Sequence, residues 1–470
     1  MSSNSEKRKV VIIGAGPGGY AAAIRLGQYG LNPVVIEKAE IGGVCLNWGC
    51  IPTKALYSTT EPLGNLESWR GRGIELGDPS FDLEKIVNHQ LEVVNSLTAG
   101  VEKLIESNGG EIVRGRARLF PGPKVRVEKN SGGELELNPD NVIVATGSAP
   151  IELPGFSFEE EGVWNSKQAV KPDEVPGKLV ILGAGVIGLE MGTIYSRLGS
   201  EVEILEMEDG ILPGMDLGRR FESFLSRELK KAGIKVHTET KAVELREESG
   251  ENLVVGEKDG EAKEYPADKT LVAVGRSPVL DVLAEDLDLG TDDKQYIPTD
   301  ESCRTQKEGV FAIGDVAGPP LLAHKALRQG LIAAAAIAGE DIRGYKYVPS
   351  VVFSDPEYAE VGLSESKAKQ EGYSPVIGSF PFRASGKALA MDATEGMVQL
   401  VVDEDSDRVL GGAVLGHNAS DLIAEIGLAA ESGLTAREIA ATIHAHPTLS
   451  EAVMEAAENV DGKAIHTSNR

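Results

Sequence analysis

The sequence is poor in cysteine, since its 470 residues include only Cys45, Cys50 and Cys303. Three cysteines exclude a disulfide-stapled extracellular scaffold and favour a reducing compartment, for which we expect the cytoplasm. Four residues separate Cys45 from Cys50, which is too wide for a thioredoxin-like Cys-x-x-Cys, and no second Cys or His pair nearby completes a zinc site. The pair therefore indicates a local redox site. The alternative, a structural staple, is weak because so short a loop closes little chain entropy.

Basic side chains are also scarce, with 47 Lys and Arg against 73 Asp and Glu and a net charge of −26. Such a surface repels nucleic acid and anionic membranes, so we expect neither as a partner. The acidic excess fits a solvated surface or an adaptation to high salt, and composition leaves both open. Long hydrophobic runs are absent too, because the most apolar stretch, Leu331–Gly339, is too short to cross a bilayer. The polar segment 1–9 leads directly into an expected strand, so we expect no cleavable signal.

Glycine, by contrast, is abundant, with 55 residues, and it opens the chain with a dinucleotide-binding pattern. A short apolar strand, a Gly-x-Gly-x-x-Gly turn, a helix, a second strand and an acid follow one another, at Val10–Ile13, Gly14 to Gly19, Tyr20–Leu26, Val34–Ile36 and Glu37. In such a unit Gly14 makes the turn, Gly16 admits a pyrophosphate and Gly19 lets the helix pack closely. Glu37 is placed to bind a ribose 2′-hydroxyl.

The same unit recurs later, with the acid again 23 residues after the first glycine. Its parts are Leu179–Leu182, Gly183, Gly185, Gly188, a helix through Leu198, Val202–Leu205 and Glu206. Two such units predict two bound dinucleotides that exchange electrons. The alternative is one functional site beside a vestigial copy, and it is disfavoured because both copies keep every glycine and the acid. Because the residues after Glu206 are Met207, Glu208 and Asp209, with no Lys or Arg, the second site favours NAD over NADP.

The segments around these units alternate between helix and strand patterns. We expect helices at Leu83–Ile105 and Leu321–Ala338 and strands at Glu111–Leu119, Val125–Leu137, Asn141–Ala145, Thr270–Val274 and within Thr305–Asp315. Three of these strands end in Thr146-Gly147, Gly275-Arg276 and Gly314-Asp315, where strand ends meet a cofactor. Asp315 can bind a sugar-like chain. Arg276 is expected near the nicotinamide nucleotide, with a surface arginine as the ordinary alternative.

The composition shifts at Tyr345–Pro349. Beyond this point we expect a hairpin, formed by Gly396–Val402 and Val409–Leu415. We also expect three helices, at Ser420–Ser432, Thr435–Ile443 and Leu449–Glu458. Just before the last helix stands His446, followed by Pro447, which suits a first helical turn. Glu451 is spaced to reach back and orient the imidazole, an arrangement for general acid/base chemistry near a thiol. An equally open alternative is that Glu451 only caps the helix.

These features together resemble the flavin-dependent pyridine nucleotide–disulfide oxidoreductases, over most of the chain from Lys9 to Glu458. The most specific stretches are Gly42–Lys54 and His444–Glu451, although Val44 and Trp48 depart from the usual family residues. The resemblance implies an α/β fold with two Rossmann-like domains, for FAD and NAD, and a C-terminal α+β dimerisation domain. The implied boundaries are 1–153 and 278–346 for the FAD domain, 154–277 for the NAD domain and 347–470 for the interface domain.

The resemblance also implies a role for each matching residue. The FAD positions are Gly14, Gly16, Gly19, Glu37, Ala117, Gly147, Asp315 and Ala323, and the NAD positions are Gly183, Gly185, Gly188, Glu206, Gly275 and Arg276. Lys54 and Glu190 would form an ion pair between the flavin and the nicotinamide. Cys50 would face the flavin and Cys45 would exchange with substrate. His446, oriented by Glu451, would serve the partner subunit's site, so the active form would be a homodimer.

The implied activity is oxidation of a protein-bound dihydrolipoyl dithiol to its disulfide, with reduction of NAD. The lipoyl carrier would be another chain, within a 2-oxo acid dehydrogenase or glycine-cleavage complex. A glutathione-type reductase would prefer basic residues after Glu206, and a mercuric reductase would need a further C-terminal cysteine pair. A non-catalytic flavin-binding scaffold would not need Cys45, Cys50, His446 and Glu451 together.

Overall fold

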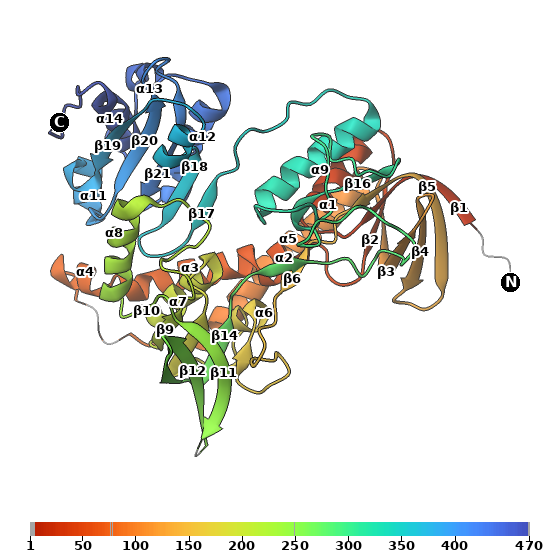
Figure 1. Cartoon of the computed structure of the whole chain (residues 1–470), viewed down its shortest axis with the longest axis horizontal. Helices are drawn as coiled ribbons and strands as arrows, with labels where there is room; N and C mark the ends of the chain where they lie inside the picture. The colour runs from red at the N-terminus through yellow and green to blue at the C-terminus, as the bar shows by residue number, and fades with distance from the viewer. Residues whose placement is uncertain (1–4, 76, 78, 249, 469–470) are drawn as a thin grey trace.

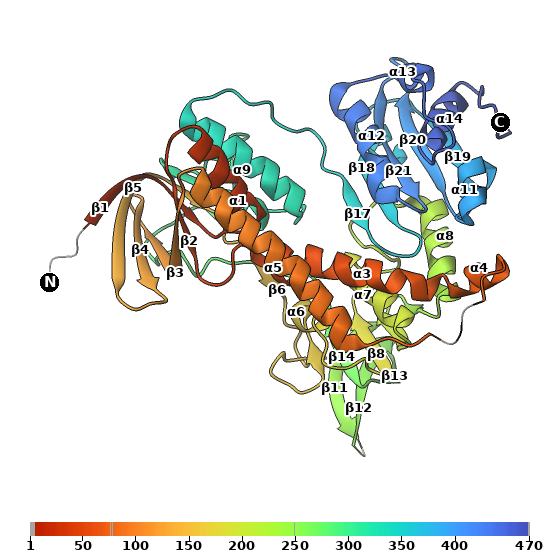
Figure 2. The same cartoon turned by 180° about the vertical axis from the view of Figure 1, so that it is seen from behind.

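The three largest β-sheets organise the molecule, and helices pack on each of them (Figure 1). The computed structural model describes residues 5–75, 77, 79–248 and 250–468. The first and third sheets lie at opposite ends of the molecule, the second lies below them in Figure 1, and the long helices α3 and α5 run between the three, as the reverse view in Figure 2 also shows. No helix in the described ranges is long and apolar enough to span a membrane.

The first unit is built on parallel strands in the order β2–β1–β5–β16, completed by the meander β3–β4–β5. Its strands are β1 (Ser5–Ile13), β2 (Val34–Glu37), β3 (Glu111–Phe120), β4 (Lys124–Lys129), β5 (Glu134–Val144) and β16 (Val310–Ala312). Its helices are α1 (Pro17–Gln28), α2 (Gly43–Trp48), α3 (Cys50–Gly64), α4 (Leu66–Gly71), α5 (Leu83–Ser107), η1 (Gly314–Ala317) and α9 (Ala323–Ala338).

The last four residues of β1, Val10–Ile13, are apolar without interruption because both faces of the strand are covered there. Val10 and Ile12 pack with residues of α1 and α9, whereas Val11 and Ile13 pack toward β3, β4 and the segment near residue 282. Helices α1 and α9 approach closely, since a side chain at Gly330 would place its Cβ 2.4 Å from the carbonyl oxygen of Gly18.

The second unit is a five-stranded parallel sheet in the order β10–β9–β8–β14–β7, flanked by the antiparallel set β11–β12–β13. Its elements are β7 (Val163–Trp164), α6 (Ser166–Ala169), β8 (Lys178–Leu182), α7 (Val186–Arg197), β9 (Glu201–Leu205), α8 (Gly218–Lys231), β10 (Lys235–His237), β11 (Lys241–Glu248), β12 (Glu251–Lys258), β13 (Glu261–Pro266) and β14 (Lys269–Val272). Strands β6 (Ser148–Pro150) and β15 (Arg276–Pro278) pair antiparallel where the chain enters and leaves this unit.

The third unit is an antiparallel sheet in the order β17–β18–β21–β20–β19. Its elements are β17 (Ser350–Val352), β18 (Tyr358–Gly362), α10 (Glu365–Gln370), β19 (Pro375–Pro381), η2 (Phe382–Ala384), α11 (Gly386–Met391), β20 (Met397–Asp403), β21 (Val409–Leu415), α12 (Ala419–Ser432), α13 (Ala436–Ala441) and α14 (Glu451–Val460). The predicted α/β class, with two Rossmann-like units and a C-terminal α+β unit, is therefore confirmed.

Two expectations about local structure were wrong. Val125–Leu137 is not one strand, because the chain turns at Asn130–Gly133 and the strand expected at 141–145 is the continuation of β5. Pro447 does not lie in the first turn of the last helix, since α14 begins only at Glu451. In the first place a glycine-containing turn separates β4 from β5, and in the second the helix does not begin before Glu451.

Candidate active site

A large cavity of about 1540 Å³ brings most of the predicted site residues together. It lies between the first and second units and also touches the β17–β18 connection. Sixteen predicted residues line it: Gly14, Gly16, Glu37, Cys45, Cys50, Lys54, Ala117, Gly147, Gly183, Gly185, Glu190, Glu206, Gly275, Arg276, Asp315 and Ala323. The four others, Gly19, Gly188, His446 and Glu451, do not line it.

The two glycine loops have the same geometry, and it fits a bound dinucleotide. A Cβ at Gly16 or Gly185 would meet no atom within 4 Å, so open space stands beside each loop where a pyrophosphate can approach. A Cβ at Gly19 would lie 2.0 Å from the oxygen of Gly14, and one at Gly188 would lie 2.0 Å from the oxygen of Gly183. Gly19 and Gly188 thus stay outside the cavity because they let each helix pack on its own turn.

The acid of each copy is fixed by backbone amides. Glu37 accepts hydrogen bonds from the amides of Ala15 and Ala39, both at 2.8 Å. Glu206 accepts them from Ala184 at 2.7 Å and Glu208 at 2.9 Å. Both carboxylates are buried and line the cavity. Each carboxylate oxygen keeps acceptor capacity for a second donor, such as a ribose hydroxyl.

The glycine geometry predicts opposite outcomes for two similar substitutions. Gly16→Ala should leave the unfolding temperature of the apoprotein unchanged while weakening FAD binding by about 10- to 100-fold, because the added methyl enters only the ligand's space. Gly19→Ala should destabilise the apoprotein itself by about 1–3 kcal/mol through overpacking. Thermal unfolding and FAD fluorescence titration measure the two effects. Unchanged FAD affinity in Gly16→Ala would remove the first loop as the pyrophosphate site.

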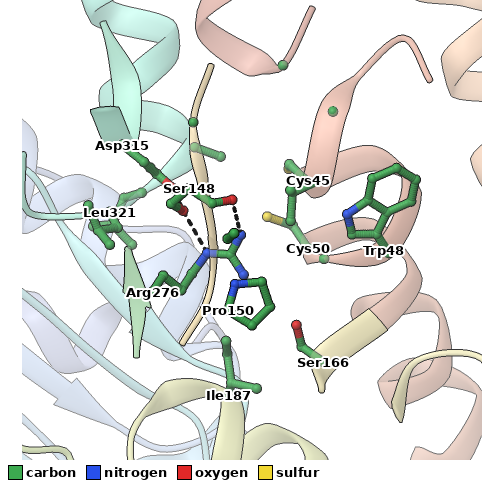
Figure 3. A pocket seen from close by; sticks show the side chains of 18 of the residues that line it. Cys45, Trp48, Cys50, Ser148, Pro150, Ser166, Ile187, Arg276, Asp315 and Leu321 are labelled. Atoms are coloured by element: carbon green, nitrogen blue, oxygen red, sulfur yellow. Dashed lines mark hydrogen bonds between the residues drawn. The ribbon is translucent and has the colours of Figure 1, made fainter. Parts of the chain in front are cut away.

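The two cysteines lie on consecutive helices that are broken at Gly49. Cys45 sits in the first turn of the six-residue α2, whereas Cys50 is the first residue of the fifteen-residue α3. Residues five apart on one straight helix point away from each other, so the break is what brings the two thiols together. The structure records both as free thiols, partly exposed and lining the cavity (Figure 3).

The environment separates the two thiols chemically. The hydrogen bond from Cys45 lowers the pKa of Cys50 most strongly; Lys54 lowers it further, whereas burial and Glu190 oppose the shift. The same hydrogen bond, together with burial, raises the pKa of Cys45. The start of α3 also favours an anion at Cys50. The lowered pKa therefore falls on Cys50 and the raised pKa on Cys45.

Lys54 and Glu190 form the expected ion pair within this cavity. Lys54 Nζ lies 2.8 Å from both carboxylate oxygens of Glu190. The backbone amide of Phe353 donates to the same carboxylate at 3.2 Å, and Lys54 Nζ lies 4.3 Å from the centre of the Phe353 ring. Lys54 is on α3 and Glu190 on α7, so the pair joins the first unit to the second.

Arg276 reaches a residue that the sequence did not single out. Its Nε donates to Ser148 Oγ at 2.7 Å and its terminal nitrogen donates to the Ser148 carbonyl at 2.6 Å, as Figure 3 shows. Ser148 Oγ in turn donates to Asp315 at 2.5 Å. Burial lowers the pKa of Arg276 although Asp315 and Cys50 act against the shift. The only sequence signal for Ser148 was its place directly after Thr146-Gly147.

His446 and Glu451 form a pair away from this cavity. His446 Nδ1 lies 2.8 Å from Glu451 Oε1, and the amide of Thr448 donates to Oε2 at 2.8 Å. Partial burial raises the pKa of Glu451, but the donors Thr448 and His446 outweigh it and lower the pKa overall. The His446 side chain is 79% exposed, which leaves Nε2 open to a molecule outside this chain. Sequence reasoning missed a second pair, His444 Nε2 with Glu425 Oε1 at 2.8 Å.

Comparisons with known proteins agree with this architecture. Residues 8–330 match the family model described as pyridine nucleotide-disulphide oxidoreductase, and residues 348–457 match the dimerisation domain of the same family. Dihydrolipoyl dehydrogenases of Haloferax volcanii and Bacillus subtilis are each 44% identical to the chain, over 98% and 97% of both proteins. The crystal structure of LpdA from Mycobacterium tuberculosis superposes with a TM-score of 0.89 at 27% identity, covering 96% of this chain and 99% of that one.

The two family models together cover all three units of the molecule. The family model over the first two units confirms the expected cofactors, FAD and NAD, and the dimerisation model over the third unit supports a homodimer. With two glycine cradles and a cysteine pair lining one cavity, the chain belongs to the pyridine nucleotide–disulphide oxidoreductases.

Proposed function

We propose that the chain oxidises the dihydrolipoyl group of a separate carrier protein to lipoyl and passes the two electrons to NAD. The observation that carries the proposal is the cysteine pair at the head of α2 and α3, placed in one cavity with both nucleotide cradles. The dihydrolipoyl dehydrogenase relatives point to the same dithiol substrate.

Thiol exchange starts with Cys45 and Cys50 joined as a disulfide. A thiolate of the substrate attacks the sulfur of Cys45, and the bond to Cys50 breaks, so that Cys50 leaves as a thiolate. The lowered pKa of Cys50 makes it the better leaving group of the two. The second substrate thiol then attacks the mixed disulfide, which releases the cyclic lipoyl disulfide and leaves Cys45 reduced.

His446 of one subunit accepts the proton that this exchange releases in the active site of the partner subunit. Glu451 can only accept a hydrogen bond, so it keeps the His446 proton on Nδ1 and leaves Nε2 free as a base. Nε2 takes the proton of the attacking substrate thiol. A site shared between subunits explains why His446 is exposed in one chain and does not line that chain's own cavity.

The first glycine cradle, Glu37 and the residues around Asp315 would hold FAD, and the second cradle, with Glu206, would hold NAD. FAD supplies the two-electron transfer between the dithiol and the nicotinamide. The ion pair of Lys54 and Glu190 would lie between the flavin and the nicotinamide, and Lys54 would stabilise the negative charge on Cys50. The chain's part is to align donor and acceptor and to exclude water.

The division into an FAD domain (1–153 and 278–346), an NAD domain (154–277) and an interface domain (347–470) is part of this proposal. It is supported by the separate sheets of the three units. We place the reaction in the cytoplasm, where reduced thiol substrates persist and the chain's three cysteines suit the redox state.

An anaerobic titration tests the proposed function. Dihydrolipoamide should reduce the FAD-loaded protein and produce a long-wavelength thiolate–flavin absorbance, and NAD should then remove that absorbance as NADH forms. NADP should not replace NAD. A flavin that stays oxidised with dihydrolipoamide but is reduced by NADH or NADPH would assign the chain to reduction of another disulfide.

A further inference from the structure

A short segment of the third unit, Phe353–Asp355, enters the cavity region from the β17–β18 connection and contacts both helices that carry the ion pair. We propose that Phe353 is a positioning residue that holds Lys54 against Glu190 beside the cysteine pair. This inference rests on the proposed function, in which Cys50 must be a thiolate.

Phe353 contacts both members of the ion pair at once. Its backbone amide donates to Glu190 Oε1 at 3.2 Å, and its ring centre lies 4.3 Å from Lys54 Nζ. The Lys54 side chain is 31% exposed and flexible, whereas that of Glu190 is only 6% exposed. A cation over an aromatic face is held electrostatically, so the ring restrains the mobile partner while the amide restrains the buried one.

Further contacts fix the segment itself. Tyr57, one turn after Lys54 on α3, packs edge-to-face on Phe353 with ring centres 5.9 Å apart, and its hydroxyl donates to the Ser354 carbonyl at 2.8 Å. Arg197, two turns after Glu190 on α7, lies 4.5 Å from the centre of the Tyr57 ring and donates to Asp355 at 2.6 Å. Side chains on one face of α3 and one face of α7 therefore contact the segment Phe353–Asp355. These contacts restrain the position of the Phe353 ring.

The position of the Lys54 ammonium matters because it acts on Cys50. Lys54 is one of the groups that lower the pKa of the Cys50 thiol. The other titratable groups that interact with Cys50 are Cys45 from α2, Glu190 from α7, Arg276 from β15 and Tyr20 from α1. Without the ring, Lys54 gains freedom and spends less time near the thiolate. Loss of Phe353 should therefore shift the titration of Cys50 upward.

The test isolates Cys50 in a Cys45→Ser background of the FAD-loaded protein. The rate of alkylation of Cys50 by iodoacetamide is followed against pH by mass spectrometry of its peptide; Cys303 is buried. Adding Phe353→Leu, which keeps the backbone amide and most of the volume, should raise the half-maximal pH by about half to one unit and slow alkylation at neutral pH by about three- to tenfold. Adding Lys54→Met instead, which removes the Lys54 charge altogether, should give the largest upward shift of the half-maximal pH.

Two matched variants separate positioning from general damage. Phe353→Tyr keeps the aromatic face and should leave the Cys50 titration in place, whereas Phe382→Leu removes a fully buried ring elsewhere in the third unit and should also leave it in place. An unchanged titration in Phe353→Leu, or an equal shift in Phe382→Leu, would overturn the proposal. The titration needs no turnover, so its result stands apart from whether dihydrolipoamide is the substrate.

Discussion

Replacing Cys45 with serine is expected to lower NAD-coupled oxidation of dihydrolipoamide by at least about 10³-fold, because a hydroxyl cannot form the mixed disulfide on which the exchange depends. The FAD content should stay at one per chain, since the hydrogen bonds that shape the first glycine loop join Gly14 to Ile36, Ala15 to Glu37 and Gly42 to Ala15. The measurement is the initial rate of NADH formation under saturating substrates, beside the flavin absorbance of the purified variant.

Cys303→Ser is the matched control for this substitution. Cys303 is buried in the core between β1, α1 and α9, and its pKa is raised by burial, so its thiol is unreactive. This variant should keep near-wild-type turnover. Turnover close to wild type in Cys45→Ser would instead show that the cysteine pair carries no electrons.

His446→Ala is expected to lower the same rate by about 10²- to 10⁴-fold, the usual contribution of a general base. The effect should lie in kcat, and electron transfer from NADH to an artificial acceptor, which needs no substrate thiol deprotonation, should persist. Glu451→Gln should lower the rate less, because the amide of Thr448 and the local fold still hold the imidazole near its place.

A mixed dimer decides whether His446 acts in the partner's site. A dimer of one Cys45→Ser chain and one His446→Ala chain has one complete site if cysteines and histidine come from different subunits, and none if they come from the same subunit. Differently tagged chains purified as the heterodimer should thus show about half the wild-type rate, although each parent homodimer is nearly inactive. A heterodimer as inactive as its parents would place His446 in its own subunit's site or outside catalysis.

Local pattern was enough to predict the parts of the site that lie close together in sequence. The glycine loops, with Glu37 and Glu206, were predicted because each βαβ unit carries its turn, its helix and its acid within about two dozen residues. The same locality explains the prediction of the cysteine pair and of the His446–Glu451 pair, whose members are five residues apart.

Contacts between distant segments were not predictable in the same way. Phe353 is 299 residues from Lys54 in sequence, and nothing in the apolar stretch around it marks a contact with the ion pair. Ser148 meets Arg276 only because β6 and β15 pair where the chain enters and leaves the second unit. Apolar spacing also does not locate the break at Gly49, because a broken helix and a continuous helix have the same apolar spacing.

Strand β16 pairs with β5 across an interval of more than 160 residues, and α9 packs on α1 across an interval of more than 290 residues. During ribosomal synthesis, the second sheet has all its strands once residue 272 has emerged, whereas the first still lacks β16 and its covering helix. Until then, α1 and β5 expose apolar surface that later becomes core. The first unit therefore completes its fold only after the second unit, although its synthesis starts earlier. Its N-terminal part is thus the part of the nascent chain that must be protected from aggregation for longest.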